Sequence, residues 1–100
     1  MDARQLIRIS KALGDATRFG IFQALVADGE LSCGDLTKHF PIAQPTVSHH
    51  VKVLIDAGLV SARKAGQHSY FSALPATLTQ YRQALGALGA PAARRPVARR

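Results

Sequence analysis

The chain has 100 residues, of which 47% are hydrophobic, and its formal net charge is +7 with an isoelectric point near 10.6. This length fits one domain with a small core, and no apolar run is long enough for a membrane span. The single cysteine, Cys33, excludes an internal disulfide framework and is typical of a reducing compartment. The N-terminal segment lacks an apolar signal-peptide core, so we expect the protein in the cytoplasm.

A basic chain of this kind favours a polyanionic partner, but the charge is unevenly distributed. Four arginines lie in residues 90–100, which leaves a net charge of +3 for residues 1–89. The Ala, Pro and Arg composition of residues 90–100 predicts a disordered basic tail, which would either add non-specific DNA affinity or contribute nothing measurable. We therefore expect one folded domain over residues 1–89.

Two amphipathic helices are predicted at the start of the chain, over residues 2–13 and 16–28. Asp2 and Asp15 are suited to cap them, and Gly14 separates them. Leu6, Ile9 and Leu13 form one apolar face of the first helix. On the second helix the positions that we expect to face a core are Phe19, Phe22, Leu25 and Val26.

A short third helix follows, with Ser32 as its cap and Pro41 as its stop. Its Asp35 and His39 have the spacing of half a metal site, although an ordinary pair on the helix surface explains them more simply. Cys33 lies near the start of this helix, where a thiol can become reactive. Since a second cysteine is absent from the sequence, Cys33 is either an inert structural thiol or a possible redox site without an intramolecular disulfide.

Residues 44–58 predict a helix with a stop at Gly58 and a surface suited to the DNA major groove. Its narrow apolar stripe consists of Val47, Val51 and Leu54. The polar residues on its other faces that we expect to bind DNA are Gln44, Thr46, Ser48, His49 and Lys52. His50 lies beside the apolar stripe, so we expect it to be half-buried and hydrogen-bonded.

In residues 59–73 the sequence pattern changes from helical to β-like. Two short β-like runs flank Ala65-Gly66-Gln67, which predicts a hairpin with glycine at the turn. A basic-tipped hairpin after a DNA-reading helix is typical of a winged helix-turn-helix domain. The tip residues that we expect to bind DNA are Arg63, Lys64, Gln67 and His68. The alternative is a solvated hairpin whose charges protect a sheet edge from aggregation.

After Pro75, a last helix carries an apolar seam with spacings of three and four residues, formed by Leu78, Tyr81, Leu85 and Leu88. This narrow seam resembles that of a coiled coil and predicts a homodimer. The alternative is that the last helix folds back on the first helix of its own chain.

From Asp15 to Phe71 the sequence resembles the ArsR/SmtB family of winged-helix repressors. The segments that carry the resemblance are KALGDATRFGIFQAL, GELSCGDLTKHFPIAQPTVSHHVKVLIDAGLV and RKAGQHSYFSA. The Ser-x-His-Leu-x-x-Leu signature of the family is present at residues 48–54, with Val51 in place of leucine. A second departure is Ala43, which replaces the serine that usually caps this helix.

The resemblance implies a mainly α fold with a small β-hairpin, in the order four helices, two strands, one helix. It also implies a homodimeric repressor whose two DNA-reading helices bind successive major grooves of an imperfect inverted repeat in double-stranded DNA. The interface residues expected from the resemblance and the seam are Leu6, Ile9, Leu78, Tyr81, Leu85 and Leu88. The alternative function is an architectural or protein-interaction module without sequence-specific readout.

No cofactor, metal site or enzymatic activity is expected. The sequence has neither a phosphate-binding loop nor paired carboxylates on one element. At the positions of the cysteine ligands of arsenic-sensing members it has Ser32, Gly34 and Thr37, and residues 75–89 lack the Asp and His ligands of zinc-sensing members. The inducer is unknown, and the signal could be a small molecule, oxidation of Cys33 or the concentration of the protein itself.

Overall fold

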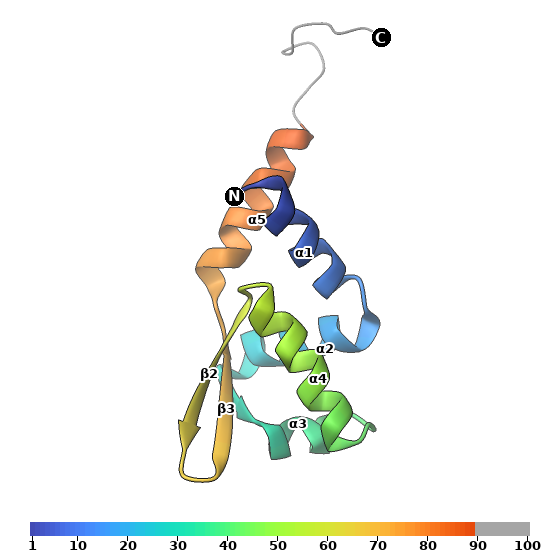
Figure 1. Cartoon of the computed structure of the whole chain (residues 1–100), viewed down its shortest axis with the longest axis vertical. Helices are drawn as coiled ribbons and strands as arrows, with labels where there is room; N and C mark the ends of the chain where they lie inside the picture. The colour runs from blue at the N-terminus through green and yellow to red at the C-terminus, as the bar shows by residue number, and fades with distance from the viewer. Residues whose placement is uncertain (90–100) are drawn as a thin grey trace, which may run out of the picture.

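The computed structural model describes residues 1–89, which form five helices and one three-stranded antiparallel sheet (Figure 1). The helices are α1 (Ala3–Leu13), α2 (Ala16–Asp28), α3 (Cys33–His39), α4 (Gln44–Asp56) and α5 (Pro75–Leu88), and the strands are β1 (Glu30–Ser32), β2 (Val60–Ala65) and β3 (His68–Ala73). This arrangement confirms the predicted winged helix-turn-helix fold. The predicted tail, residues 90–100, lies outside the described residues. None of the helices in residues 1–89 is long and apolar enough to cross a membrane.

The first three helices begin where polar side chains cap their free backbone N–H groups. The Asp2 carboxylate accepts from the first turn of α1 at 2.8 Å, and Asp15 accepts from the Arg18 backbone N–H at 2.9 Å. At α3 the capping is reciprocal, since Ser32 Oγ accepts from Asp35 N–H and the Asp35 carboxylate accepts from Ser32 N–H. These backbone hydrogen bonds hold the pKa of Asp15 and of Asp35 below its usual value.

The sheet contains one strand more than the predicted hairpin. Residues 30–32 form β1, which pairs with β3 and places Leu31 opposite Phe71, so that the strand order is β1-β3-β2. The expectation of only two strands was wrong because a three-residue strand is too short to show a period of its own. Its extended conformation comes from pairing with a partner far along the chain.

The core lies where the inner face of the sheet meets α1 to α4. Its large buried side chains are Ile9, Ile21, Phe22, Leu25, Leu31, Leu36, Val47, Val51, Leu54, Leu59, Val60 and Phe71. The expectation that Phe19 and Val26 face this core was wrong, because they are 44% and 56% exposed. Ile21 is fully buried instead, so the inward face of α2 differs from the expected one.

The helix α4 ends in a left-handed turn at Gly58, as predicted. Gly58 has φ +81°, its N–H donates to Ile55 C=O at 2.9 Å, and Leu59 N–H donates to Leu54 C=O at 3.0 Å. This pair of bonds is the Schellman pattern, in which apolar residues on both sides of the turn are commonly in contact. Leu54 and Leu59 are both fully buried, so the same turn ends α4 and directs the chain into β2.

We expect Gly58→Ala to lower the free energy of unfolding by about 1–2 kcal/mol, because a Cβ disfavours positive φ. The added Cβ would meet its nearest atoms at 3.6 Å or more, so the cost comes from the backbone conformation and not from a clash. Urea denaturation would measure the change. The control is Gly34→Ala, which lies in α3 without positive φ and should not destabilise; equal losses in both variants would contradict the argument.

Candidate nucleic-acid interface

One face of α4 is buried and the opposite face is polar and exposed. Val47, Val51 and Leu54 are at most 1% exposed. All five α4 residues predicted to bind DNA, namely Gln44, Thr46, Ser48, His49 and Lys52, are exposed. Because a helix turns about 100° per residue, burying the apolar stripe directs His49 and Lys52 away from the protein. A narrow stripe therefore leaves most of the helix surface available to a ligand.

Lys52 forms an ion pair with Asp56 on the next turn, with Nζ at 3.4 Å from Oδ2. The two side chains are 73% and 58% exposed. A solvent-exposed i,i+4 pair of this kind contributes little free energy. The Lys52 ammonium can therefore exchange Asp56 for a phosphate at small cost.

Ala43 gives α4 no side-chain cap, in agreement with the sequence. A cap would normally accept from the N–H groups of the second and third helical residues. Here the second residue is Pro45, which has no N–H, and the Thr46 N–H donates to Ala43 C=O at 3.0 Å. The missing serine therefore leaves few donors unsatisfied at the start of this helix.

Arg18 connects α4 to the two helices before it. Its guanidinium donates to Ala12 C=O at 2.8 Å at the end of α1, and its Nη1 lies 3.2 Å from His50 Nδ1. Arg18 can donate to His50 only if Nδ1 is unprotonated, which assigns the ring proton to Nε2. His50 is half-buried and hydrogen-bonded, as predicted, and it therefore fixes α4 on the body of the domain.

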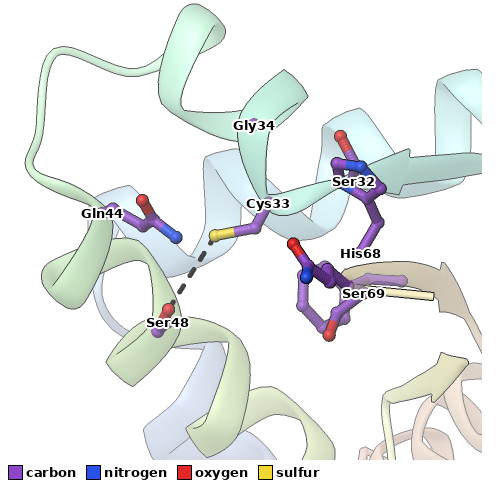
Figure 2. A pocket seen from close by; sticks show the side chains of 9 residues that line it. Ser32, Cys33, Gly34, Gln44, Ser48, His68 and Ser69 are labelled. Atoms are coloured by element: carbon purple, nitrogen blue, oxygen red, sulfur yellow. Dashed lines mark hydrogen bonds between the residues drawn. The ribbon is translucent and has the colours of Figure 1, made fainter. Parts of the chain in front are cut away.

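A cavity of about 310 Å³ separates the first turns of α4 from the start of α3 and from β3. Figure 2 shows Cys33 pointing from α3 toward α4, with His68 and Ser69 of β3 across the cavity. Cys33 Sγ lies 3.8 Å from Ser48 Oγ, within reach of a weak hydrogen bond. Cys33 therefore lies beside Ser48, one of the expected DNA-reading residues. Its thiol is half-buried, whereas Ser48 is exposed.

The hairpin turn has the predicted glycine and projects polar side chains. Gly66 has φ +64° and Gln67 has negative φ, which is the sign pattern of a type II′ turn. Lys64, Gln67 and His68 are all exposed at this tip. Since β1 pairs only with residues 70–72, the tip extends beyond the support of the third strand.

Arg63 differs from its neighbours at the tip because its exposed guanidinium is paired with a carboxylate. Its Nη2 donates to Glu30 Oε1 at 2.8 Å and its Nε donates to Glu30 Oε2 at 3.2 Å. This hydrogen-bonded guanidinium holds the pKa of the Glu30 carboxyl below its usual value. Sequence reasoning missed Glu30 because only the pairing of β1 with β3 brings it near the hairpin; no local spacing indicates the contact.

The residues predicted for a dimer interface do not share one environment. Ile9 is 0% exposed within the single chain, so its assignment to the interface was wrong: a fully buried side chain has no surface to offer a partner. Leu6, Leu78 and Tyr81 are half-buried, and Tyr81 Oη lies 2.8 Å from Ser10 Oγ on α1 of the same chain. Leu85 and Leu88, by contrast, are 42% and 66% exposed.

Within residues 1–89, His, Cys, Asp and Glu side chains do not gather in groups of three that could hold a metal ion. Asp35, one of the two residues with metal-site spacing on α3, uses its carboxylate to accept from the Ser32 backbone. Its neighbour His39 is exposed.

Comparisons with known proteins agree with this geometry. A model of the helix-turn-helix domain family matches residues 13–62. The arsenical resistance operon repressor of Staphylococcus aureus is 42% identical over 71 residues, which cover 71% of this chain and 67% of that protein. An ArsR-like transcriptional regulator from Rhodococcus sp. RHA1 superimposes with a TM-score of 0.78 at 29% identity, covering 87% of this chain and 81% of that one. The crystal structure of another ArsR family transcriptional regulator gives a TM-score of 0.84 at 25% identity, covering 96% and 98% of the two chains.

Proposed function

Because the chain belongs to the ArsR family of winged-helix transcriptional repressors, we propose that it represses transcription as a homodimer bound to an imperfect inverted repeat. In each protomer α4 enters a major groove and the wing, residues 59–73, follows the adjacent backbone or minor groove. The observation that carries this proposal is the division of α4 into a buried apolar stripe and an exposed polar face.

We assign base contacts to the short side chains near the start of α4 and backbone contacts to the charged or flexible ones. The base-reading set is Gln44, Thr46, Ser48 and His49, and the backbone set is Lys52, Lys64, Gln67 and His68. Arg63 is left out of both sets because its guanidinium is bound to Glu30.

The distribution of exposed apolar side chains supports a dimer on the side away from the DNA. Large hydrophobic residues with substantial exposure occur only before α1 and on α1, α2 and α5 of the described chain: Met1, Ile7, Phe19, Val26, Leu85 and Leu88. No residue of α5 is fully buried within the chain, although the helix packs on α1 (Figure 1). Exposed apolar side chains concentrated on a few elements in this way are typical of an association interface. Both packing alternatives for α5 therefore contribute, with Tyr81 on its own chain and Leu85 offered to a partner.

The signal that releases the DNA is proposed not to be an arsenical or a metal, in contrast to what the name of the Staphylococcus aureus relative says of that protein. A trivalent arsenical needs two or three thiolates, and each chain has one cysteine. In a dimer with its reading heads one DNA turn apart, about 34 Å, the two copies of Cys33 beside α4 are too distant to share an ion. A small molecule, Cys33 oxidation and protein concentration are the signals left to test.

The first experiment is selection of bound duplexes from random DNA, followed by location of the winning site upstream of genes. A repressor should hold its selected site roughly 10³-fold or more tightly than random DNA. An architectural module would enrich no sequence, and this outcome would favour the alternative function.

On the selected site, Ser48→Ala or His49→Ala should each cost about 1–3 kcal/mol of binding free energy and relax the sequence preference. Lys52→Ala should instead weaken all sequences alike and flatten the dependence of log affinity on log salt by about 0.9. Fluorescence anisotropy titrations over a range of salt would measure both. If triple alanine substitution at Thr46, Ser48 and His49 leaves specific binding unchanged, the placement of α4 in the major groove is wrong.

Leu85→Asp should give monomers that bind the selected site roughly 100-fold or more weakly, because a charge in the seam opposes dimerisation and two-site binding is lost. Gln83→Asp adds the same charge on an exposed position on the other side of α5 and serves as the control. Sedimentation velocity would measure the oligomeric state. A wild-type protein that stays monomeric at micromolar concentration would refute the proposed dimer.

Zinc, cadmium and arsenite should leave a preformed protein–DNA complex intact when each is titrated to micromolar excess. Anisotropy of labelled duplex would follow the release. Stoichiometric release that survives Cys33→Ser would reveal a metal or arsenical site elsewhere in the protein, whereas release abolished by Cys33→Ser would place the signal at the thiol.

A further inference from the structure

The outer face of the sheet carries a cluster of polar side chains that joins all three strands. Leu31 of β1 and Phe71 of β3 are paired and buried, so the alternating neighbours point to the opposite face. On that face Arg63 of β2 reaches over the central strand to Glu30 of β1 with two hydrogen bonds, at 2.8 and 3.2 Å. The guanidinium carbon lies 4.7 Å from the centre of the Tyr70 ring.

The position of this cluster along the sheet decides what it can do. One cross-strand row of the sheet contains Arg63, Tyr70 and Ser32. It is the last row toward the hairpin turn in which all three strands are paired. Beyond it, residues 64–69 form a two-stranded tip that does not pair with β1. The cluster therefore lies at the base of the free part of the wing.

An exposed ion pair contributes little to the free energy of folding unless it is bidentate or part of a network, and the Glu30–Arg63 pair is both. The side chains of Arg63 and Glu30 are 57% and 40% exposed. The aromatic ring of Tyr70 restrains the guanidinium from one side, and Ser72 Oγ donates to Glu30 Oε2 at 3.5 Å. The main effect of the pair is on the orientation of the wing, because the cross-strand contact fixes β2 relative to β1 and hence to α3.

We propose that Glu30 and Arg63 form a clamp that sets the direction of the wing, so that Arg63 is a positioning residue and not a phosphate ligand. The consequence for DNA binding rests on the proposed function, whereas the effect on the wing itself does not. Lys64, Gln67 and His68 then meet the DNA from a hairpin whose base is fixed by an acidic residue.

Neutralising Glu30 changes DNA affinity in opposite directions depending on whether Glu30 and Arg63 form a clamp or Glu30 acts only through its charge. Removing an acidic charge near the interface normally strengthens DNA binding, because the protein becomes more positive. Under the clamp, Glu30→Gln weakens binding to the selected site by roughly threefold to tenfold, the scale of coupling within one hydrogen-bonded network. Asp28→Asn is the matched control: it changes the charge equally, two residues away, at an exposed carboxylate.

The experiment measures binding of both variants, and of the double variant Glu30→Gln/Arg63→Gln, to the selected duplex and to a random duplex of equal length over a range of salt. The double variant keeps the wild-type net charge. For the double variant, the clamp predicts weaker binding of the selected duplex than the wild type shows, with an unchanged salt dependence. A phosphate contact by Arg63 predicts a salt slope flatter by about 0.9, and this result would overturn the proposal.

Hydrogen exchange of the backbone amides without DNA gives a second readout that does not depend on the function. Glu30→Gln should accelerate exchange at Lys64–His68 while leaving the amides of α2 unchanged. If Glu30→Gln binds as tightly as Asp28→Asn and the wing amides exchange at the wild-type rate, no clamp exists. If the wild type selects no DNA sequence, the proposed function fails, and the exchange rates alone still decide the clamp.

Discussion

The half-buried side chain of Arg18 connects α4, the proposed DNA-reading helix, to the rest of the domain. Arg18 neutralises the free carbonyl end of α1 and at the same time reaches His50 in the middle of α4. Its own helix, α2, starts at Asp15, whose carboxylate accepts the Arg18 backbone N–H. Three helices thus meet at one side chain. Because α1 lies on the proposed dimer side and α4 on the proposed DNA side, this contact is a physical route by which a change at one surface would reach the other.

On α4 and the wing of the described chain, two of the three Lys and Arg side chains are paired with carboxylates. Lys52 has Asp56 within 3.4 Å, Arg63 is bound to Glu30, and the remaining cation at the wing tip is Lys64. Non-specific affinity grows with the number of phosphates neutralised, so under the proposed function we expect α4 and the wing to add little affinity for random DNA. Under the proposed function, discrimination then rests on the short side chains near the start of α4 and on the direction of the wing.

Most helix boundaries could be predicted because their signals are local. Caps such as Asp15 and Ser32 and the stop at Gly58 act within a few residues of themselves, and the structure uses all three. What sequence reasoning missed is non-local: β1 exists only through pairing with β3, and that pairing alone brings Glu30 to Arg63. The inward face of α2 was mistaken for a related reason. Its two faces are both apolar, and hydrophobicity alone does not distinguish a core from a surface kept for association.

The antiparallel pairing of β1 with β3 also determines when the domain can be completed during synthesis. Leu31 is made early, but its partner Phe71 follows forty residues later, after α3, α4 and β2. The hairpin of β2 and β3 closes over a two-residue loop and is fast to form, whereas docking on β1 must close a long loop against its entropy. A nascent chain that ends before His68 therefore lacks both the central strand and Phe71, a buried side chain of the core. Because β1 has no strand to pair with until residues 70–72 have been made, the three-stranded sheet is completed only when most of the chain has been synthesised.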